Sequence, residues 1–587
     1  MNLRAGRKAK AAAAFHAAAA LFAAGEALLA PDRWDTQYAL AYDLTFEHAH
    51  AAYVTSSFDE AELRIDALMT RARTVVERAA VVELAVAFHM TRGHCARAVE
   101  IGLPFLRASG IALPIHPTDA EVEEETESVW QALGDRAIAD LIDLPPMTHP
   151  EIQGIMNVLI GVSVPAYFVD PMLMYLAAVR MIRLSLLHGN AELSSQAYVS
   201  FATQIGPKFG RYKEAYEFGK LSYDLASRGR LLTAKSIVYY AFANYIVFWR
   251  HHYREILPYT RSGFEVAVES GDLNYACYHC ILASEIPLLC GEPLEDVLRE
   301  VERRFDFVRK TGYAFVHRIL LSVHYLIQSL RGRPVRFSML DGSELDQDAF
   351  EKGLDPADFQ SAYAYYYSAK AQALFVLGSP RGGRRGDRRQ RRVPVEERRQ
   401  RVDRRELLLP RARPRRLLRR GVTAVGPARG AVRLRAAARR VGGELPGEFF
   451  HKHALVRAEL ARLRGHDTEA PGLYEQAVAS AREHGFVQIE AIACERAAAF
   501  YRARGLTIPA DAYLQRARAG YFRWGAHAKV EQLDQRHPHL VERKPMAPTL
   551  TFAVRAEQFD VLSVVKASQT ISGSSSCRAC WRRCCAS

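Results

Sequence analysis

Apolar residues recur along most of the chain at positions i, i+3, i+4 and i+7, and Gly, Pro or Asp separates one such segment from the next. This spacing places apolar side chains on one face of an α-helix, whereas the strict alternation typical of strands is rare. In PTDAEVEEE, Thr118 and Glu121 have the spacing of a capping box and predict a helix over residues 119–133. The pattern therefore predicts an all-α chain.

A local pattern repeats along the chain and predicts how the helices are paired. A helix ends at a small residue, a short polar turn follows, and Ala comes early in the next helix. Gly can adopt the left-handed conformation that ends a helix, and Ala lets the next helix pack closely. The pattern occurs at Phe58 with Ala61, Gly93 with Ala98, Gly210 with Ala215, Gly291, Gly465 with Ala470 and Ala477, and Gly505 with Ala512.

The spacing of these turns predicts a repeat of about 40 residues, because Gly465 and Gly505 are 40 residues apart and Gly210 and Gly291 are 81 apart. One helix pair cannot bury its apolar face alone, so successive pairs stack. We expect a tetratricopeptide-like helix-pair solenoid (a superhelix) with a disordered Arg-rich interruption. The expected organisation is an α-solenoid at 1–378, the interruption at 379–447, C-terminal helical repeats at 448–546, and at 547–587 a linker, a helix (559–573) and a Cys-rich tail.

The Arg-rich interruption accounts for the positive net charge of the chain. Residues 381–440 contain 23 Arg, no Lys and five acidic residues, a net charge of +18, so the +14 of the whole chain leaves −4 for the rest. Three interpretations compete: a nucleic-acid-binding segment, a solvated disordered insert, and out-of-frame translation of GC-rich DNA between two frame errors. The window has no aromatic residue for base stacking and is built chiefly from residues with GC-rich codons. These features favour the third interpretation.

The composition of the whole chain, 49% apolar and 25% charged, is that of a folded chain. Five cysteines are scattered through apolar segments and are expected to be buried free thiols, which favours a cytoplasmic location: Cys95, Cys277, Cys280, Cys290 and Cys494. Residues 155–169 are apolar but shorter than the roughly 20 residues of a membrane span, so we expect core and no membrane span. The Ala-rich run near the N-terminus predicts a packed helix rather than a signal peptide.

No catalytic, cofactor-binding or metal-binding motif is found in the sequence, and we expect no catalytic residue, no cofactor and no metal. Phosphate-binding and kinase loops are absent. His251-His252 and His451-x-His453 do not share one helical face and are expected to be polar residues at helix ends. Cys277-x-x-Cys280 lies among apolar residues and predicts packing rather than redox chemistry. The four cysteines crowded after residue 576 favour a further frame error over a zinc site.

An aromatic stripe, VYYAFANYIVFW, covers residues 238–249. Such a stripe is typical of a helical core, but the concave groove of a solenoid also uses aromatic side chains to bind peptides or other domains. Tyr240, Tyr245 and Trp249 are therefore the candidate partner-groove residues.

Several segments together resemble one part of a family of large bacterial signalling proteins. They are NLRAGRKAKAAAAF, LIDLPPMTHPEIQGIM, FGRYKEAYEFGKLSYDL, VFWRHHYREILPYTRSGFEVAVESGDLNYACY, FFHKHALVRAELARLRG and YFRWGAHAKVEQLDQRHPHL. In that family a serine/threonine kinase domain is followed by an AAA-type ATPase, a tetratricopeptide-like helical region, a GAF domain and often a histidine kinase. The resemblance covers residues 2–378 and 448–573 and places the chain between the ATPase and GAF domains.

The resemblance implies a non-catalytic interaction and linker region of a signal-transduction protein, with protein partners or neighbouring signalling domains. None of the family's catalytic residues matches a position here, so the chain as it stands is not expected to be an enzyme. The alternative is a freestanding binding protein whose Arg-rich insert contacts nucleic acid, through residues 381–440 alone.

Overall fold

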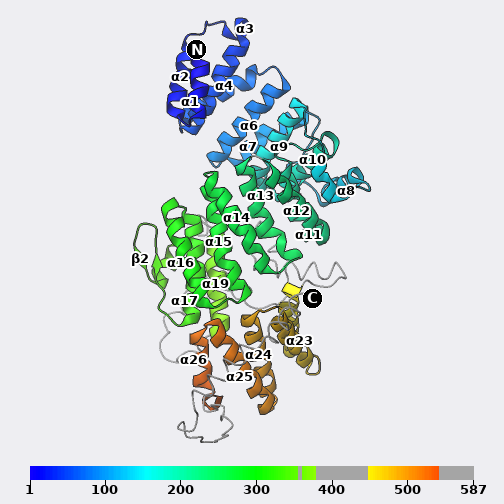
Figure 1. Cartoon of the computed structure of the whole chain (residues 1–587), viewed down its shortest axis with the longest axis vertical. Helices are drawn as coiled ribbons and strands as arrows, with labels where there is room; N and C mark the ends of the chain where they lie inside the picture. The colour runs from blue at the N-terminus through cyan, green and yellow to red at the C-terminus, as the bar shows by residue number, and fades with distance from the viewer. Residues whose placement is uncertain (230, 355–359, 379–446, 541–587) are drawn as a thin grey trace, which may run out of the picture. The chain divides into compact units, whose positions relative to one another are not determined.

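The structure is a computed structural model that describes residues 1–229, 231–354, 360–378 and 447–540. Helices dominate these residues, and helices next to one another in sequence pack side by side as pairs (Figure 1). The chain is an all-α helix-pair solenoid, as the apolar pattern predicts. The Arg-rich interruption and the expected helix at 559–573 lie outside the described residues, and the predicted domain boundaries remain predictions.

The helices follow the segments that the sequence pattern separates. The first are α1 (Asn2–Ala11), α2 (Phe15–Ala27), α3 (Arg33–Thr36), α4 (Tyr38–Val54), α5 (Phe58–Arg71), α6 (Val75–Thr91), α7 (Cys95–Ala108), α8 (Asp119–Leu133), the 3-10 helix η1 (Ile138–Asp143) and α9 (Pro150–Val169). Next come α10 (Pro171–His188), α11 (Ser194–Phe209), α12 (Tyr212–Arg228), α13 (Leu232–Tyr245), η2 (Val247–Trp249), η3 (Tyr253–Glu255), α14 (Ile256–Glu269), α15 (Leu273–Cys290), α16 (Leu294–Thr311) and α17 (Ala314–Arg331).

The last described helices follow a short hairpin. Strands β1 (Phe337–Ser338) and β2 (Glu344–Leu345) are antiparallel, with Phe337 opposite Leu345. After them come α18 (Gln347–Lys352), α19 (Gln360–Leu377), α22 (Gly447–Arg464), α23 (Glu469–Glu483), α24 (Val487–Arg502), α25 (Thr507–Trp524), α26 (His527–Arg536) and η5 (Pro538–Leu540).

The turn pattern read from the sequence is confirmed. Each glycine assigned to the end of a helix has a positive φ, between +75° and +77°: Gly93, Gly210, Gly291, Gly465 and Gly505. The capping box of Thr118 and Glu121 is present with both of its hydrogen bonds, and α8 has the predicted bounds. Local turn and cap chemistry therefore fixed these helix ends.

One small residue of the pattern is misassigned. Ala61 and Ala215 are fully buried and are each the fourth residue of their helix. In α25 the fourth residue is Ala510, which is fully buried, whereas Ala512 is exposed. Two residues further along a helix is about 200° around its axis, so Ala512 faces away from the neighbouring helix. The prediction for Ala512 is therefore wrong, because α25 begins earlier than the sequence suggests.

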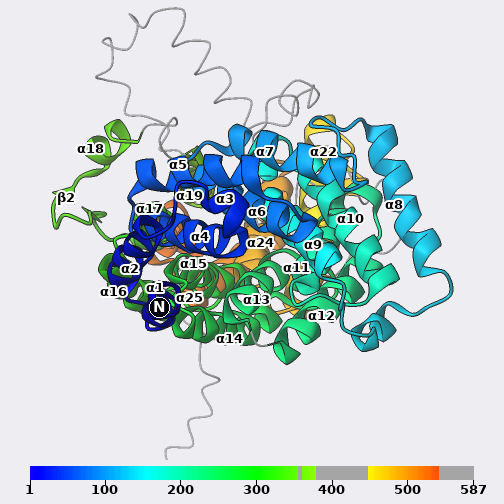
Figure 2. The same cartoon turned by 90° about the horizontal axis from the view of Figure 1, so that it is seen from above.

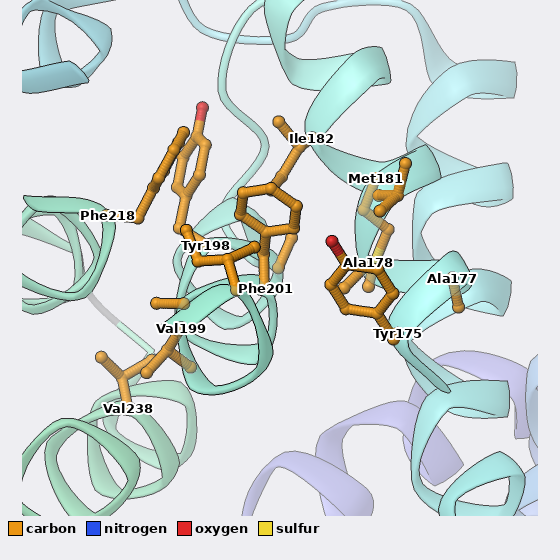
Figure 3. Close-up of a cluster of buried hydrophobic side chains, with 14 of the residues drawn as sticks. Tyr175, Ala177, Ala178, Met181, Ile182, Tyr198, Val199, Phe201, Phe218 and Val238 are labelled. Atoms are coloured by element: carbon orange, nitrogen blue, oxygen red, sulfur yellow. The ribbon is translucent and has the colours of Figure 1, made fainter. Parts of the chain in front are cut away.

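Aromatic side chains fill the core between α10, α11 and α12. Tyr175 stacks on Phe201 with ring centroids 5.6 Å apart, and Phe201 meets the edge of Phe218 at 5.1 Å (Figure 3). All three side chains are fully buried. Aromatic pairs of this kind contribute about 0.5–1.5 kcal/mol beyond the burial of their area. This cluster joins three successive helices into one core.

Alternate helices form two layers in the middle of the chain (Figure 2). α11, α13, α15 and α17 contact one another across the layer as well as along the chain, whereas α14 and α16 contact mainly the helices next to them in sequence. In stacked helix pairs the layer with the closer spacing is the concave one, which repeat proteins use for binding. α13, α15 and α17 therefore belong to the layer where a binding surface is expected.

Helices α22 and α24 pack against the middle of the chain. Phe449 of α22 lies 6.3 Å from Phe248 between ring centroids, and Gln488 Nε2 of α24 donates a hydrogen bond of 2.7 Å to the Leu289 carbonyl of α15. Gly291 has a φ of +77°, which favours glycine, and a Cβ there would lie 1.9 Å from Gln488 Oε1 and would displace that side chain. These contacts lie within residues 1–532, which form one compact unit.

Among the described residues, α9 is the one helix long and apolar enough to cross a membrane. It packs on α6, α7 and α10, and Met156, Leu159 and Val162 on it are fully buried. The prediction of core for residues 155–169 is therefore confirmed for part of the segment, whereas Val164 and Phe168 are 53% and 65% exposed.

Candidate functional site

Five tyrosines gather on α13, on α15 and immediately before α17, and they are called the tyrosine layer here. They are Tyr240, Tyr245, Tyr275, Tyr278 and Tyr313. The Tyr240 ring lies 5.6 Å from Tyr275, 5.3 Å from Tyr278 and 6.3 Å from Tyr245. Tyr278 continues the contact to Tyr313 at 5.9 Å. Each side chain is of intermediate burial, and Tyr240 and Tyr245 also pack against the main hydrophobic core.

The hydroxyls of Tyr240 and Tyr245 are neutral. Burial, followed by the neighbouring tyrosines, raises the pKa of Tyr240 and of Tyr245 well above the ordinary value. Asn244 Nδ2 donates a 3.2 Å hydrogen bond to the Tyr240 hydroxyl, and the hydroxyls of Tyr278 and Tyr313 lie 2.9 Å apart. The layer therefore offers apolar ring faces together with hydroxyl groups, a combination enriched at protein interfaces.

Helical geometry separates the two adjacent tyrosines of α13. Tyr239 points into the core, where its ring stacks on Tyr223 at 4.3 Å and its hydroxyl lies 2.8 Å from Ser227 Oγ. Consecutive residues are about 100° apart around a helix, so Tyr240 points in a different direction, toward Tyr275 and Tyr278 of α15. The same sequence run thus supplies both core and surface.

Trp249 does not belong to the tyrosine layer, and this corrects its assignment to a partner groove. Its side chain is 5% exposed. Ring centroids of Tyr212 and Phe248 lie 4.5 Å from it, and Phe449 lies at 6.5 Å. Trp249 ends η2, and the turn of the chain after α13 directs its ring between α12 and α22. A large apolar ring enclosed on several sides is a core residue.

Tyr275, Tyr278 and Tyr313 were not singled out in the sequence. Tyr275 and Tyr278 are three residues apart and share a face of α15, and this spacing was a signal available in LNYACYHC. The sequence interpretation considered the cysteines of this segment and not its tyrosines. Cys277 and Cys280 are free and fully buried, and burial raises the pKa of Cys280 to about 12. The predicted burial of these two cysteines is confirmed, and their lack of redox chemistry stays a prediction.

Two acidic side chains flank the tyrosines of α15. Asp272 caps the helix by accepting a 3.3 Å hydrogen bond from the Tyr275 backbone N–H, and burial raises its pKa. Glu285 is 9% exposed, and its Oε2 has no hydrogen-bond partner within the described part of the chain. Burial raises the pKa of Glu285 to about 8. A carboxyl group buried without a partner is costly and often marks a functional position.

A fully buried histidine packs against the tyrosine layer. His279 lies against Tyr240 with ring centroids 5.6 Å apart. A Cβ at Gly263 of α14 would lie 2.2 Å from the His279 ring, so glycine makes room for it. Burial, followed by the charge of Arg304, lowers the pKa of His279 to about 3. The ring is therefore neutral and acts as packing between α14 and the layer.

The paired histidines are not simply polar residues at helix ends. His451 is fully buried, and its ring lies 4.4 Å from Phe486 between centroids. His252 stacks on Phe486 at 5.2 Å, and its Nε2 lies 3.1 Å from the His484 carbonyl oxygen. The prediction is wrong for His451, which is fully buried against Phe486. It is confirmed for His252, which is the N-cap of η3 and whose Nδ1 accepts a 3.0 Å hydrogen bond from the Arg254 backbone N–H. His251 lies 2.9 Å from Glu255 at the surface.

Across residues 1–229, 231–354, 360–378 and 447–540, no three His, Cys, Asp or Glu side chains come together to hold a metal ion. The tyrosine layer can recognise a ligand by contact, aromatic stacking and hydrogen bonding.

No family model matches the chain, and no curated protein matches it. Among solved structures, the chain is similar to a circular tandem repeat protein with novel repeat topology and enhanced subunit contact surfaces. The two share 12% identity over 92% of this chain and 87% of that one, with a TM-score of 0.14. A TM-score this low carries no structural argument. The assignment of the fold rests on the paired helices themselves.

Proposed function

We propose that this chain is a non-catalytic interaction scaffold, which binds a segment of a partner protein over the tyrosine layer. The single observation that carries the proposal is the continuous set of ring contacts from Tyr245 through Tyr240 and Tyr278 to Tyr313, on partly exposed side chains of the more closely spaced helix layer. Tyrosine supplies large contact area at a low cost in side-chain entropy.

The scaffold is proposed to be the linking region of a bacterial signal-transduction protein, between an ATPase and a GAF domain. This part of the proposal is supported by the sequence resemblance over residues 2–378 and 448–573. Repeat scaffolds suit such a role because each helix pair contacts its neighbours, so that a long surface is available to partner segments.

The proposal is tested by selecting binders from a library of random 12-residue peptides displayed on phage, with the full 587-residue chain as target. Selected peptides are then titrated against Tyr240→Ala and Tyr275→Ala variants. Interface tyrosines typically cost about 2 kcal/mol or more when truncated, so we expect binding to weaken about 30-fold. Far-UV circular dichroism should show unchanged helical content.

Phe522→Ala is the matched control, because Phe522 of α25 is an aromatic residue, 59% exposed, outside the tyrosine layer. It should leave the peptide affinity unchanged. The proposal fails if no peptide is selected, or if the Tyr240 and Tyr275 variants bind the selected peptides as tightly as the wild-type chain.

A further inference from the structure

Three arginine side chains converge on one carboxylate where α23, α24 and α25 pack side by side (Figure 1). Arg482 in the last turn of α23 and Arg516 of α25 both donate from Nε to Glu490 Oε1 of α24, at 3.1 and 3.0 Å. Arg523 Nη2 lies 3.8 Å from Glu490 Oε2, beyond hydrogen-bond distance. These three arginines are called the arginine cluster here.

The packing of α25 on α24 holds the arginine cluster together. Glu490 is buried, with 8% of its side chain exposed, and gives two guanidinium groups one fixed acceptor. Arg516 and Arg523 are seven residues apart, so they lie on the same face of α25. Gly520 lies between them, and a Cβ there would lie 2.8 Å from the Cβ of Ala491. The small glycine therefore lets α25 approach α24 closely beside Glu490, which brings both arginines to the carboxylate.

The arginine cluster carries more positive charge than its carboxylate compensates. Three arginines and one glutamate leave a net charge of +2 on these four residues. Within the described residues, the Nη groups of Arg482 and Arg516 form no hydrogen bond, and neither does the guanidinium of Arg523. The arginine side chains are between 40% and 62% exposed. A ligand can therefore reach the unused N–H groups.

We propose that the arginine cluster binds a phosphorylated side chain of a partner segment. A phosphate monoester carries a charge of about −1.5 to −2 at pH 7 and has three acceptor oxygens, so it can offset both excess charges and accept from all three guanidinium groups. A carboxylate would offset one charge only. The cluster is separate from the tyrosine layer, so this inference goes beyond the proposed function and does not depend on it.

The exposure of the arginine cluster favours a phosphate group carried by a segment over free phosphate. An ion pair at an exposed surface contributes about 1 kcal/mol or less, because water and salt screen it. A segment that covers the arginines reduces this screening and adds contacts of its own, and free phosphate does neither. Binding of useful affinity is therefore expected for the segment.

The test offers the full chain a library of 12-residue peptides with phosphoserine at one fixed position and random residues elsewhere, at pH 7.5, where phosphoserine is largely a dianion. Selected peptides are titrated by isothermal titration calorimetry against wild type and Arg523→Gln. This variant keeps both hydrogen bonds to Glu490, so far-UV circular dichroism should show unchanged helical content. We expect binding to weaken about tenfold, since a hydrogen bond to a charged group contributes about 1.5–3 kcal/mol.

Arg303→Gln is the matched control, because Arg303 is an exposed arginine of α16 paired with Glu300, and its replacement changes the net charge by the same amount. It accounts for general attraction of phosphate to the chain, including the net charge of +18 on residues 381–440. The control should bind as tightly as wild type. Equal weakening in Arg303→Gln and Arg523→Gln would show general attraction and overturn the inference.

Two further comparisons test the ligand. A selected peptide with serine in place of phosphoserine should lose most of its affinity, and equal binding of the two peptides would also overturn the inference. Inorganic phosphate should displace the peptide only at a much higher concentration than unlabelled peptide does. Displacement at equal concentrations would mean that the arginine cluster takes free phosphate, which would overturn the assignment to a partner segment.

Discussion

The hydroxyl groups of Tyr278 and Tyr313 lie 2.9 Å apart and join α15 to the residue that precedes α17. This hydrogen bond connects two successive helices of the more closely spaced layer. It also fixes the relative position of two rings of the tyrosine layer, whose centroids are 5.9 Å apart.

Removing one of these hydroxyls should destabilise the chain without changing its fold. A hydrogen bond of this kind contributes about 1 kcal/mol, so Tyr278→Phe is expected to lower the free energy of unfolding by about that amount. Adding Tyr313→Phe should cost little more, since the bond is already lost. Tyr275→Phe is the control, because no hydrogen bond to the Tyr275 hydroxyl is found in the described residues. Urea titration followed by circular dichroism gives the comparison, and equal losses for Tyr275→Phe and Tyr278→Phe would contradict it.

Gly263→Ala should be destabilising although alanine is the better helix former. The new methyl group would lie 2.2 Å from the His279 ring, which is fully buried. Overpacking of this kind costs about 1–3 kcal/mol. Gly472→Ala on α23 is the matched control, because nothing lies within 4 Å of the added Cβ. It should be neutral or stabilising by up to about 1 kcal/mol. In thermal unfolding, Gly263→Ala should lower the melting temperature, whereas Gly472→Ala should leave it unchanged or raise it.

The raised pKa of Glu285 predicts a loss of stability as pH rises. Burial raises its pKa to about 8 from 4.5. Between these two values the unfolded chain has released the proton that the folded chain retains, so the free energy of unfolding falls by about 1.4 kcal/mol per pH unit. The contribution is complete below pH 4.5 and is lost as pH rises through about 8.

Glu285→Gln removes this titration. The difference in urea midpoint between wild type and variant is measured at pH 5 and pH 8, and the variant should gain relative stability at the higher pH. A difference that stays constant with pH would show that Glu285 is ionised in the folded chain.

Glu459 should behave in the opposite way. Burial alone would raise its pKa, but hydrogen bonds from Arg496, Tyr474 and Arg462 outweigh burial and lower the pKa to about 2. Arg496 donates two of these bonds, at 3.1 and 2.8 Å. The stabilising effect is complete above pH 4.5 and is lost as pH falls through about 2, with a total of about 3 kcal/mol.

Acid titration of unfolding should reveal this network. Wild type should lose stability between pH 4.5 and 2 more steeply than Glu459→Gln, which lacks the titrating group. Glu475→Gln, at an exposed position of α23, should keep the wild-type slope. Parallel curves for wild type and Glu459→Gln would mean that the arginines do not hold the carboxylate.

The sequence predicted part of the candidate site, but it did not show which residues from other segments complete it. Tyr240 and Tyr245 were found because aromatic residues cluster in one segment. Tyr278 and Tyr313 come from other segments, and their contact depends on α15 and α17 lying side by side. Trp249 belongs to the same stripe as Tyr240, yet the turn after α13 places it in the core. A linear stripe does not reveal which of its residues remain exposed after the chain turns.

The sequence by itself determined the all-α class, the ends of many helices and the positions of the turns. These depend on local physics: apolar spacing, capping side chains, and glycine at positive φ, as at Gly210 and Gly291. Tertiary structure alone decided that Phe486 lies between His252 and His451, and that Glu285 is buried without a partner. Burial and pairing depend on helices that are distant in sequence, and no local pattern records those contacts.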